Sequence, residues 1–311
     1  MPIPAAFRGR TRLPVIAAPM FLVSGPELVL AACKAGVLGT FPALNQRTTA
    51  GFSDWLTQIG DALAADPQAA PYGVNLIVHR TNPRVQADLE VCVQHKVPLV
   101  ITSLGAVKEV VDAVHSYGGL VFHDVTNARH AEKAAQAGVD GLILVSSGAG
   151  GHAGTTNPFA LVAEVRPNFP GTLCLAGCLS SGRDVAAAIA MGADYAYLGT
   201  RFIATREANA SARYKEMIVE SASADILYTA AISGIPASFL TQSLVEAGID
   251  PATLPKDRKI NLGEELDTES KAWKDIWSAG QGVAGIEDVP TVAELVARLQ
   301  AGWDEARSAL G

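Results

Sequence analysis

The glycine-rich stretch SSGAGGHAG, residues 146–154, is the part of this sequence best suited to chemistry. Glycines allow a backbone to approach a flat ligand closely, and an imidazole exchanges protons near neutral pH. The segment from Gly148 to Ala153 also fits the dinucleotide-binding fingerprint G-x-G-x-x-A. The stretch is therefore either a nucleotide-binding turn or a loop that presents His152 to a ligand.

The surroundings of this stretch argue against the nucleotide-binding turn. That fingerprint should follow the first strand of its unit, open a helix at once and precede an acid by about 20 residues. Here other strand–helix units come first, the next helix begins only at Asn157-Pro158, and the acid near the expected distance, Glu164, lies inside that helix. We interpret His152 as a ligand-facing base at a strand end. An exposed loop histidine without a role is the alternative.

Two later loops, AGCLSSGR and GTR, have the composition of a phosphate site. Gly177 and Gly199 would permit close approach of backbone N–H groups, and Thr200 would add a hydroxyl donor. The loops after the seventh and eighth strands of a barrel enzyme often bind phosphate in this way. The alternative is a pair of ordinary turns with a helix cap at Ser180 or Ser181.

The elements that would position these loops are short apolar runs that alternate with helical patterns. Runs that are apolar on both faces suit parallel strands covered by helices. Eight strand–helix units close into a (β/α)8 TIM barrel, and a doubly wound open sheet is the competing α/β architecture. The runs span residues 13–20, 36–41, 72–78, 97–103, 118–125, 140–147, 172–177 and 193–200.

The remainder of the chain, from residue 206, contains mainly helical segments and one polar stretch. We expect the helix within residues 208–223 to complete the barrel, and the rest to form an appended C-terminal helical cap packed over one end. The expected division is a barrel over residues 1–220 and a cap over residues 221–311.

Composition limits the partners of the protein. The 311 residues carry a formal charge of −7, which disfavours nucleic acid and anionic membranes as partners. No run approaches the roughly 18 apolar residues of a membrane-spanning helix, and the N-terminus lacks the apolar centre of a signal peptide. The four cysteines match neither a zinc site nor a disulfide scaffold. We expect a soluble, cytoplasmic protein without a metal site that acts on a small molecule.

Five ordered motifs carry a resemblance to a known family: PVIAAPM, YGVNL, GAGGHAG, AGCLSSGR and GADYAYLGTRF. Together they resemble the nitronate monooxygenase family, formerly called 2-nitropropane dioxygenases. Enoyl-ACP reductase II and NADH:quinone reductase flavoproteins share its fold. The segment WSAGQGVAGI, residues 277–286, extends the resemblance more weakly into the tail. The resemblance implies a TIM barrel with a helical cap that binds FMN without covalent attachment.

The resemblance also implies roles for individual residues. The flavin ring would lie beside Ala18, Pro19 and Met20. The ring or the ribityl chain would contact Asn75. The reactive side of the flavin would face Gly151 and His152, with His152 as the catalytic base. The phosphate would be held by Gly177, Cys178, Gly199 and Thr200. The tail would close the pocket through Gly280 and Gln281. Neighbouring positions that complete the cofactor site are Ala176 and Asp124.

Two positions depart from the pattern of the family. Asp124 stands where several relatives place a lysine near the flavin, so the charge is reversed. The glycine pair common in the strand-seven loop is Gly177-Cys178 here. Backbone donors would survive this change if the φ angle of Cys178 is negative. A thiol beside a phosphate would be mildly activated, although we favour a structural use.

The implied reaction is the oxidation of alkyl nitronates or nitroalkanes with O2 to a carbonyl compound and nitrite. A second hypothesis keeps the flavin but passes electrons from NAD(P)H to another acceptor, either a quinone or an enoyl thioester. A third is a phosphate-binding barrel that has lost redox function, for which Asp124 and Cys178 are the only support.

Overall fold

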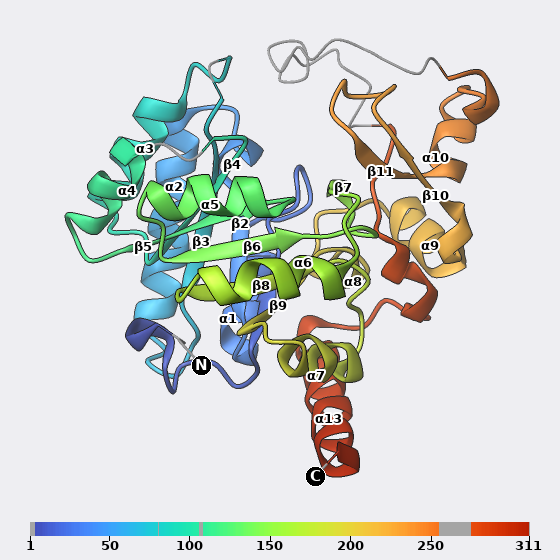
Figure 1. Ribbon diagram of the computed structural model, residues 1–311. Coiled ribbons are helices and arrows are strands. Elements are labelled where there is room, and N and C mark those ends of the chain that lie inside the picture. The colour runs from blue at the N-terminus through green and yellow to red at the C-terminus, as the bar shows by residue number, and fades with distance from the viewer. Residues whose placement is uncertain (1–3, 80, 106–107, 255–274, 311) are drawn as a thin grey trace.

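The computed structural model describes residues 4–79, 81–105, 108–254 and 275–310 (Figure 1). Its centre is a closed barrel of parallel strands in the order of the chain, in which β9 pairs with β1. All the apolar runs expected to be strands form the barrel, so the TIM-barrel prediction is confirmed and the open sheet is wrong. The barrel strands are β1 (Val15–Ala17), β2 (Leu38–Pro42), β3 (Tyr72–Ile77), β4 (Leu99–Ser103), β5 (Leu120–Val125), β6 (Gly141–Val145), β8 (Thr172–Ala176) and β9 (Tyr195–Leu198).

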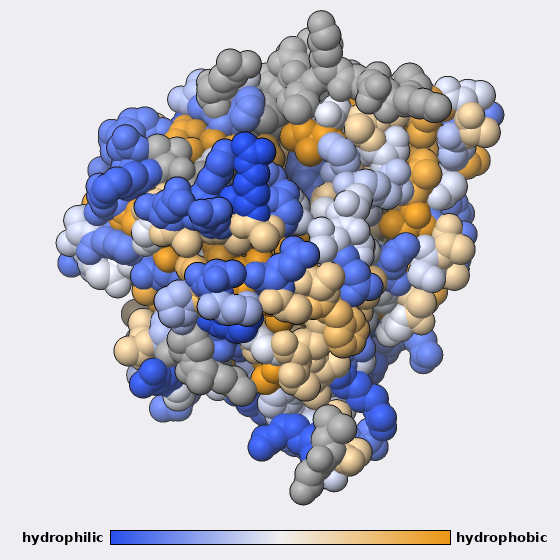
Figure 2. All heavy atoms as spheres, in the orientation of Figure 1, coloured by the Kyte–Doolittle hydropathy of each residue, from blue (hydrophilic) through white to orange (hydrophobic). Residues whose placement is uncertain are grey.

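Helices follow the strands and cover the outside of the barrel (Figure 1). Their outer faces are hydrophilic on the left side of Figure 2, and α5, for example, buries Ala131 and Ala134. The helix expected to begin at Asn157-Pro158 does so, since Asn157 caps α6. The covering helices are α1 (Pro26–Ala35), α2 (Thr49–Ala64), α3 (Val85–Gln94), α4 (Lys108–His115), α5 (Ala128–Gln136), α6 (Pro158–Val165) and α7 (Gly182–Ala190).

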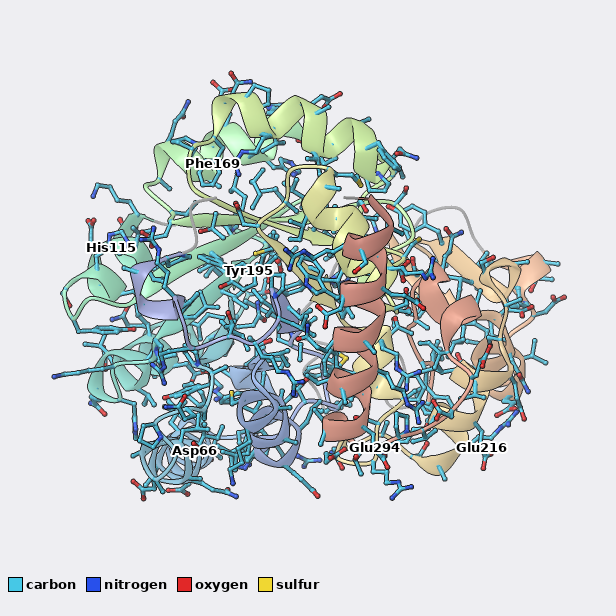
Figure 3. All side chains as sticks on the ribbon, turned by 90° about the horizontal axis from the view of Figure 1, so that it is seen from below. Asp66, His115, Phe169, Tyr195, Glu216 and Glu294 are labelled. Atoms are coloured by element: carbon cyan, nitrogen blue, oxygen red, sulfur yellow. The ribbon has the colours of Figure 1, made fainter. Side chains whose placement is uncertain are left out.

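The helix that completes the barrel is α13 (Val292–Leu310), which packs between α7 and α1 (Figures 1 and 3). The expectation that the helix within residues 208–223 would do so is wrong, because α9 (Ala212–Glu220) lies in the cap. A close backbone approach holds α13 in place, since a Cβ atom on Gly182 would lie 2.1 Å from the Leu299 carbonyl oxygen. A division at residue 220 therefore leaves one barrel helix on the cap side of the boundary.

The cap contains a β-hairpin in addition to helices. The hairpin strands are β10 (Ile226–Thr229) and β11 (Ala237–Leu240), and β11 also pairs antiparallel with β7 (Gly151–His152). Side chains including Phe239, Leu244 and Ile276 form a small separate core. The remaining described elements are α8 (Thr200–Ile203), α10 (Thr241–Glu246), η1 (Ala5–Phe7), η2 (Ala43–Asn45), η3 (Arg166–Asn168), η4 (Ser223–Asp225), η5 (Pro251–Thr253) and η6 (Gln281–Gly285).

The end of the barrel at which the strands begin is closed by aromatic packing. Phe7 lies edge-on to Tyr195, the first residue of β9, and to Phe122, with ring centroids 6.5 and 6.3 Å apart. The inward-facing apolar core around them includes Ile16 and Ile101. The opposite end of the barrel is left for a functional site, as in other barrel enzymes.

Candidate active site between the barrel and the cap

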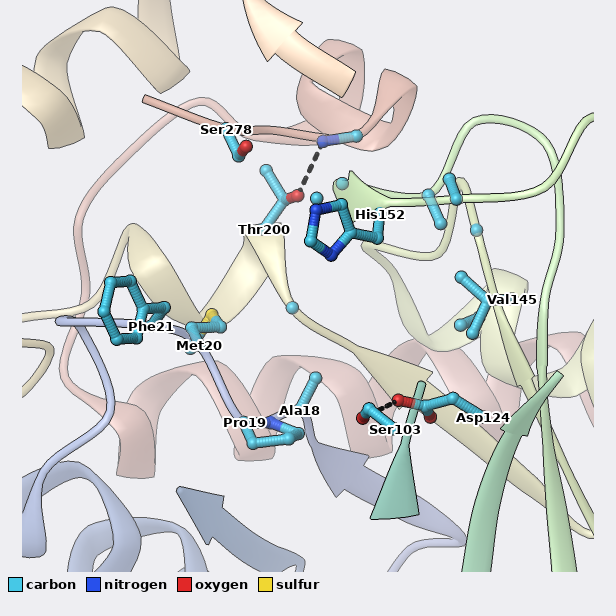
Figure 4. Close-up of a pocket in the computed structure, with 18 of the residues that line it drawn as sticks. Ala18, Pro19, Met20, Phe21, Ser103, Asp124, Val145, His152, Thr200 and Ser278 are labelled. Atoms are coloured by element: carbon cyan, nitrogen blue, oxygen red, sulfur yellow. Dashed lines mark hydrogen bonds between the residues drawn. The ribbon is translucent and has the colours of Figure 1, made fainter. Parts of the chain in front are cut away.

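A cavity of about 1340 Å³ lies over the carboxyl ends of the strands, between the barrel and the cap. Ligand pockets of proteins span roughly 300–1,000 Å³, so this cavity has room for a cofactor and a substrate together. Apart from Gln281, every candidate site residue lines it (several appear in Figure 4): Ala18, Pro19, Met20, Asn75, Asp124, Gly151, His152, Ala176, Gly177, Cys178, Gly199, Thr200 and Gly280.

His152 is positioned by the cap as well as by the barrel. Its strand β7 pairs with β11, with His152 opposite Ala237. The Tyr228 hydroxyl donates to the Ala153 carbonyl at 2.7 Å, and the Gly154 N–H donates to the Val145 carbonyl at 3.2 Å. The loop after β6 is therefore tied both to the barrel and to the hairpin.

Burial determines the charge of the His152 imidazole. It lowers the pKa of His152 to about 4, so the ring is neutral at pH 7. A neutral imidazole has a ring nitrogen that can accept a proton. His152 lines the cavity, above Ala18 and Asp124 in the view of Figure 4, so a base is available to a ligand in this space.

The segment around Gly280 supports the histidine loop from behind. A Cβ atom on Gly280 would lie 2.6 Å from the Gly148 carbonyl oxygen and 2.8 Å from the Gly150 nitrogen, so only glycine fits. The Gln281 N–H donates to the Gly148 carbonyl at 2.8 Å. Gln281 does not line the cavity, and its backbone holds the loop.

Hydrogen-bond donors gather where β9 leads into α8. The Thr200 Oγ1 accepts the Gly280 N–H at 2.9 Å, which leaves the hydroxyl hydrogen to donate into the cavity (Figure 4). The first N–H groups of a helix have no acceptor within the helix, and Gly199 is the residue before α8. Gly177 lies in the neighbouring loop, where its φ of +126° and the Ser146 Oγ, 2.4 Å from an added Cβ, both require glycine.

The other nearby helix end, that of α7, is closed by its own side chains. Ser181 caps α7, and the Asp184 carboxylate accepts the N–H groups of Ser180 and Ser181 at 2.9 and 2.8 Å. The helix cap expected at Ser180 or Ser181 is therefore found at Ser181. The N–H groups of Ser180 and Ser181 are used within the protein, so the candidate positions for an anion are Gly177, earlier in the same loop, and the start of α8.

Cys178 adopts a left-handed backbone conformation, with a φ of +57°. We expected the backbone N–H donors to survive the change from glycine only if the φ of Cys178 were negative, and this condition is not met. This conformation costs a residue with a Cβ atom about 1–2 kcal/mol. Desolvation and the Asp184 carboxylate raise the pKa of the Cys178 thiol, so this site does not activate it.

The mouth of the barrel holds a polar group of three side chains, Asn75, Ser103 and Asp124. The Asn75 Nδ2 donates to the Ser103 Oγ at 2.6 Å, and the Ser103 hydroxyl donates to the Asp124 Oδ2 at 2.6 Å (Figure 4). Burial raises the pKa of Asp124 to about 6, against the opposing effect of the Ser103 hydrogen bond. Sequence reasoning missed Ser103, although it continues the inward-facing alternation of Leu99 and Ile101.

Part of the rim of the cavity is apolar, and this part was also missed. Leu22, Leu104 and Tyr228 line the cavity although each is about 40% exposed, at 41%, 39% and 41% respectively. Tyr214 and Trp277 also line the cavity, and their rings stack with centroids 4.9 Å apart. These side chains suit an organic ligand. The signal that could have found them was their large apolar character next to strand ends or in the cap.

Two negative findings concern the described ranges alone. Within residues 4–79, 81–105, 108–254 and 275–310, no three His, Cys, Asp or Glu side chains come together as a metal site. In the same part of the chain, no helix is both long enough and apolar enough to cross a bilayer.

Comparisons with known proteins identify the family of the chain. The family model for nitronate monooxygenase matches residues 8–302. The nitronate monooxygenase of Paraburkholderia phytofirmans is 28% identical over 92% of this chain and 91% of the relative. The nitroalkane oxidase of Streptomyces ansochromogenes superposes with a TM-score of 0.83 at 26% identity, over 99% of this chain and 100% of that one. FabK of Thermotoga maritima shares the fold, with a TM-score of 0.80 at 24% identity over 97% and 96% of the two chains.

Proposed function

The chain belongs to the nitronate monooxygenase family of flavoprotein oxidoreductases, and we propose that it uses FMN to oxidise alkyl nitronates or nitroalkanes with O2. The products would be a carbonyl compound and nitrite. The observation that carries the proposal is His152, a neutral base that lines a large cavity and is fixed from both the barrel and the cap.

The residues present fit FMN. The donors at Gly199 and Thr200, with the glycine-shaped turn at Gly177, suit a single phosphate at one side of the cavity. The backbone after β1, from Ala18 to Met20, lines the same cavity and suits contact with a flat ring. The glycine-rich loop holds His152 in β-pairing and does not open a helix, so it is not used for the pyrophosphate of a dinucleotide. These features favour FMN over FAD.

The proton chemistry belongs to His152. FMN, when bound, would accept electrons from the substrate and transfer them to O2. Before that, a ring nitrogen of His152 takes the α-proton of a neutral nitroalkane, which leaves a nitronate beside an imidazolium. The two opposite charges stabilise each other and raise the basicity of an imidazole whose pKa burial lowers. A nitronate supplied as substrate needs no such step.

The cap and the rim limit the access of water to the substrate. Leu22 and Tyr228 line the cavity, and Met20 lies beside Gly199. Apolar walls strengthen the electrostatic interactions of a buried base. They also accommodate an alkyl chain.

One observation favours the second candidate function, the transfer of electrons from NAD(P)H to a quinone or an enoyl thioester. The cavity exceeds the usual size of a ligand pocket, and its rim of Leu22, Leu104 and Tyr228 suits a longer apolar substrate. Rapid anaerobic bleaching of the flavin by NADH would favour this candidate.

The proposal is tested on purified protein. Cofactor released by acid should chromatograph as FMN, and a preformed alkyl nitronate should consume O2 and yield nitrite. Recovery of FAD, or of no flavin, would contradict the cofactor assignment. Oxidation of NADH by a quinone, without turnover of either nitro substrate, would replace the proposed reaction by the second candidate.

A further inference from the structure

A carboxyl group in the barrel mouth has one oxygen that the protein leaves without a partner. Asp124 follows the inward-facing Phe122 on β5 at a spacing of two residues, so it also points into the barrel. Its Oδ2 accepts the Ser103 hydroxyl, whereas its Oδ1 is buried and has no hydrogen-bond partner in the described part of the chain. Asp124 lines the same cavity as His152 (Figure 4).

The direction of the hydrogen bonds in this group is fixed. The Asn75 amide donates to the Ser103 Oγ and to the Ile101 carbonyl oxygen, at 2.6 and 3.3 Å. An amide nitrogen only donates, so the single hydrogen of Ser103 is directed to Asp124. No side chain in this group donates a hydrogen bond to the Oδ1 atom of Asp124. A buried oxygen left in this way is unfavourable, and a ligand donor or a proton would offset that cost.

The titratable groups that face Asp124 do not neutralise it. Tyr197 of β9 and Cys174 of β8 interact with its charge, and burial raises the pKa of both well above the ordinary values, so they are neutral. The causes of the Asp124 shift are burial, which raises its pKa to about 6, and the Ser103 hydrogen bond, which lowers it. No cation contributes to this shift from the described residues.

Other titratable side chains line the cavity more widely: His123, His130, Lys133, His152, Cys178, Tyr214, Tyr228 and Asp275. The pKa values of Cys178, Tyr214 and Tyr228 are raised by burial, so these three are neutral. Burial lowers the pKa of both His123 and His152 to about 4, so they carry no charge at neutral pH. His130 and Lys133 line the cavity from α5, and neither contributes to the shift of the Asp124 pKa. A negative charge added to the barrel mouth would therefore act on Asp124 with little compensation.

On the basis of the proposed FMN site, we propose that Asp124 takes up one proton when the bound flavin is reduced and releases it on reoxidation. The reductant is the nitronate substrate, which with one water gives the carbonyl compound, nitrite, two protons and two electrons. The flavin takes these electrons with one proton and gains one negative charge. The Asp124 carboxylate takes a second proton from solvent and becomes a carboxylic acid, so the net charge of the mouth does not change. On reoxidation, O2 takes the two electrons and both protons to become hydrogen peroxide, and Asp124 returns to the carboxylate.

The physical reason is like-charge repulsion in a space of low dielectric constant. Two negative groups that share a site cannot both stay ionised, and the weaker acid binds a proton. Burial already raises the pKa of Asp124 to about 6, and the Ser103 hydrogen bond opposes a larger rise. The protonated acid can then donate its hydrogen from the oxygen that the protein leaves without a partner.

The direct test is a reduced-minus-oxidised infrared difference spectrum of the flavin-loaded protein near neutral pH. The parent should gain the C=O stretch of a protonated carboxylic acid on reduction. The Asp124→Asn variant, which is nearly isosteric and cannot titrate, should not. In redox titrations above about pH 6, the flavin midpoint potential of the parent should fall with pH more steeply than that of the variant, by about 30 mV per pH unit for the extra proton.

A second variant keeps the test informative if Asp124→Asn folds poorly. Ser103→Ala removes the hydrogen bond that favours the charged form of Asp124, so the acid should already be protonated with oxidised flavin near neutral pH. In this variant, the carboxylic acid C=O band gained on reduction should be smaller near neutral pH. The pH range in which the flavin midpoint potential falls more steeply should move to higher pH. Bound flavin with no carboxylic acid band, and with equal pH slopes in parent and Asp124→Asn, would overturn the role of Asp124 alone. A parent protein that binds no flavin would instead overturn the proposed function, and this inference with it.

Discussion

The two ends of the barrel use the same strands for opposite purposes. At the end where the strands begin, Phe7 closes a dry core around Phe122 and Tyr195. At the end where they finish, the inward positions become polar, as at Ser103 and Asp124. Stability and function are therefore separated along each strand, and a change at one end should leave the other largely intact.

The largest stability effect is expected at the closed end. Phe7→Ala removes a fully buried ring and should lower the free energy of unfolding by about 3–5 kcal/mol. Denaturant titration measures this, with Phe159→Ala as the control because Phe159 is 69% exposed. Flavin affinity and kcat/KM of the folded variant should match the parent. A selective loss of flavin would break the separation of the two ends.

A loss of stability of similar size is expected on acidification, and it arises from His123 in the barrel wall. The unfolded His123 binds a proton below about pH 6.5, whereas burial in the folded protein lowers its pKa to about 4. The unfolded state therefore binds more protons in this window, and stability falls as the pH falls through it, by up to about 3 kcal/mol. His123→Gln should lose less stability than the parent between pH 7 and pH 4.5. Equal losses would show that His123 is not buried in its neutral form.

A smaller effect is expected at the open end, on cofactor binding. Thr200→Ala should weaken FMN by about 1 kcal/mol, or up to about 3 if the hydroxyl donates to a charged oxygen. Thr200→Ser keeps the hydroxyl and should bind FMN like the parent. Flavin fluorescence titration of the apoprotein measures both. Parent-like affinity in Thr200→Ala would remove Thr200 from the phosphate site.

The smallest effect is a gain in stability at Cys178. Its left-handed backbone suits glycine, so Cys178→Gly should raise the free energy of unfolding by about 1 kcal/mol. Cys178→Ser keeps the Cβ atom and should give no gain. A loss of stability in the glycine variant would mean that the side chain contributes more than the backbone strain costs.

The sequence predicted the barrel because parallel strands covered on both faces leave continuous apolar runs, and all the runs became barrel strands. It also predicted that Gly177, Gly199 and His152 lie at the same face, because the ends of parallel strands meet there. All three line the cavity. Local patterns were sufficient for these features.

Other features depend on packing between distant segments. Nothing in the periodicity of α13 distinguishes it from a cap helix, and its place beside α7 depends on a close backbone contact at Gly182. The pairing of β7 with β11 joins a two-residue strand to a hairpin some 85 residues away. The role of Ser103 and the φ of Cys178 arise from cross-strand hydrogen bonding and loop geometry, which residue types alone do not specify.

The most direct measurement compares two substrates in one variant, His152→Ala. If His152 removes the α-proton, the variant should bind FMN normally and lose roughly 10²–10⁴-fold in kcat/KM on a neutral nitroalkane, the usual contribution of a positioned base. A preformed nitronate has already lost that proton and should be affected far less. Equal losses on both substrates would contradict this account and would show that His152 positions the ligand or supports its loop.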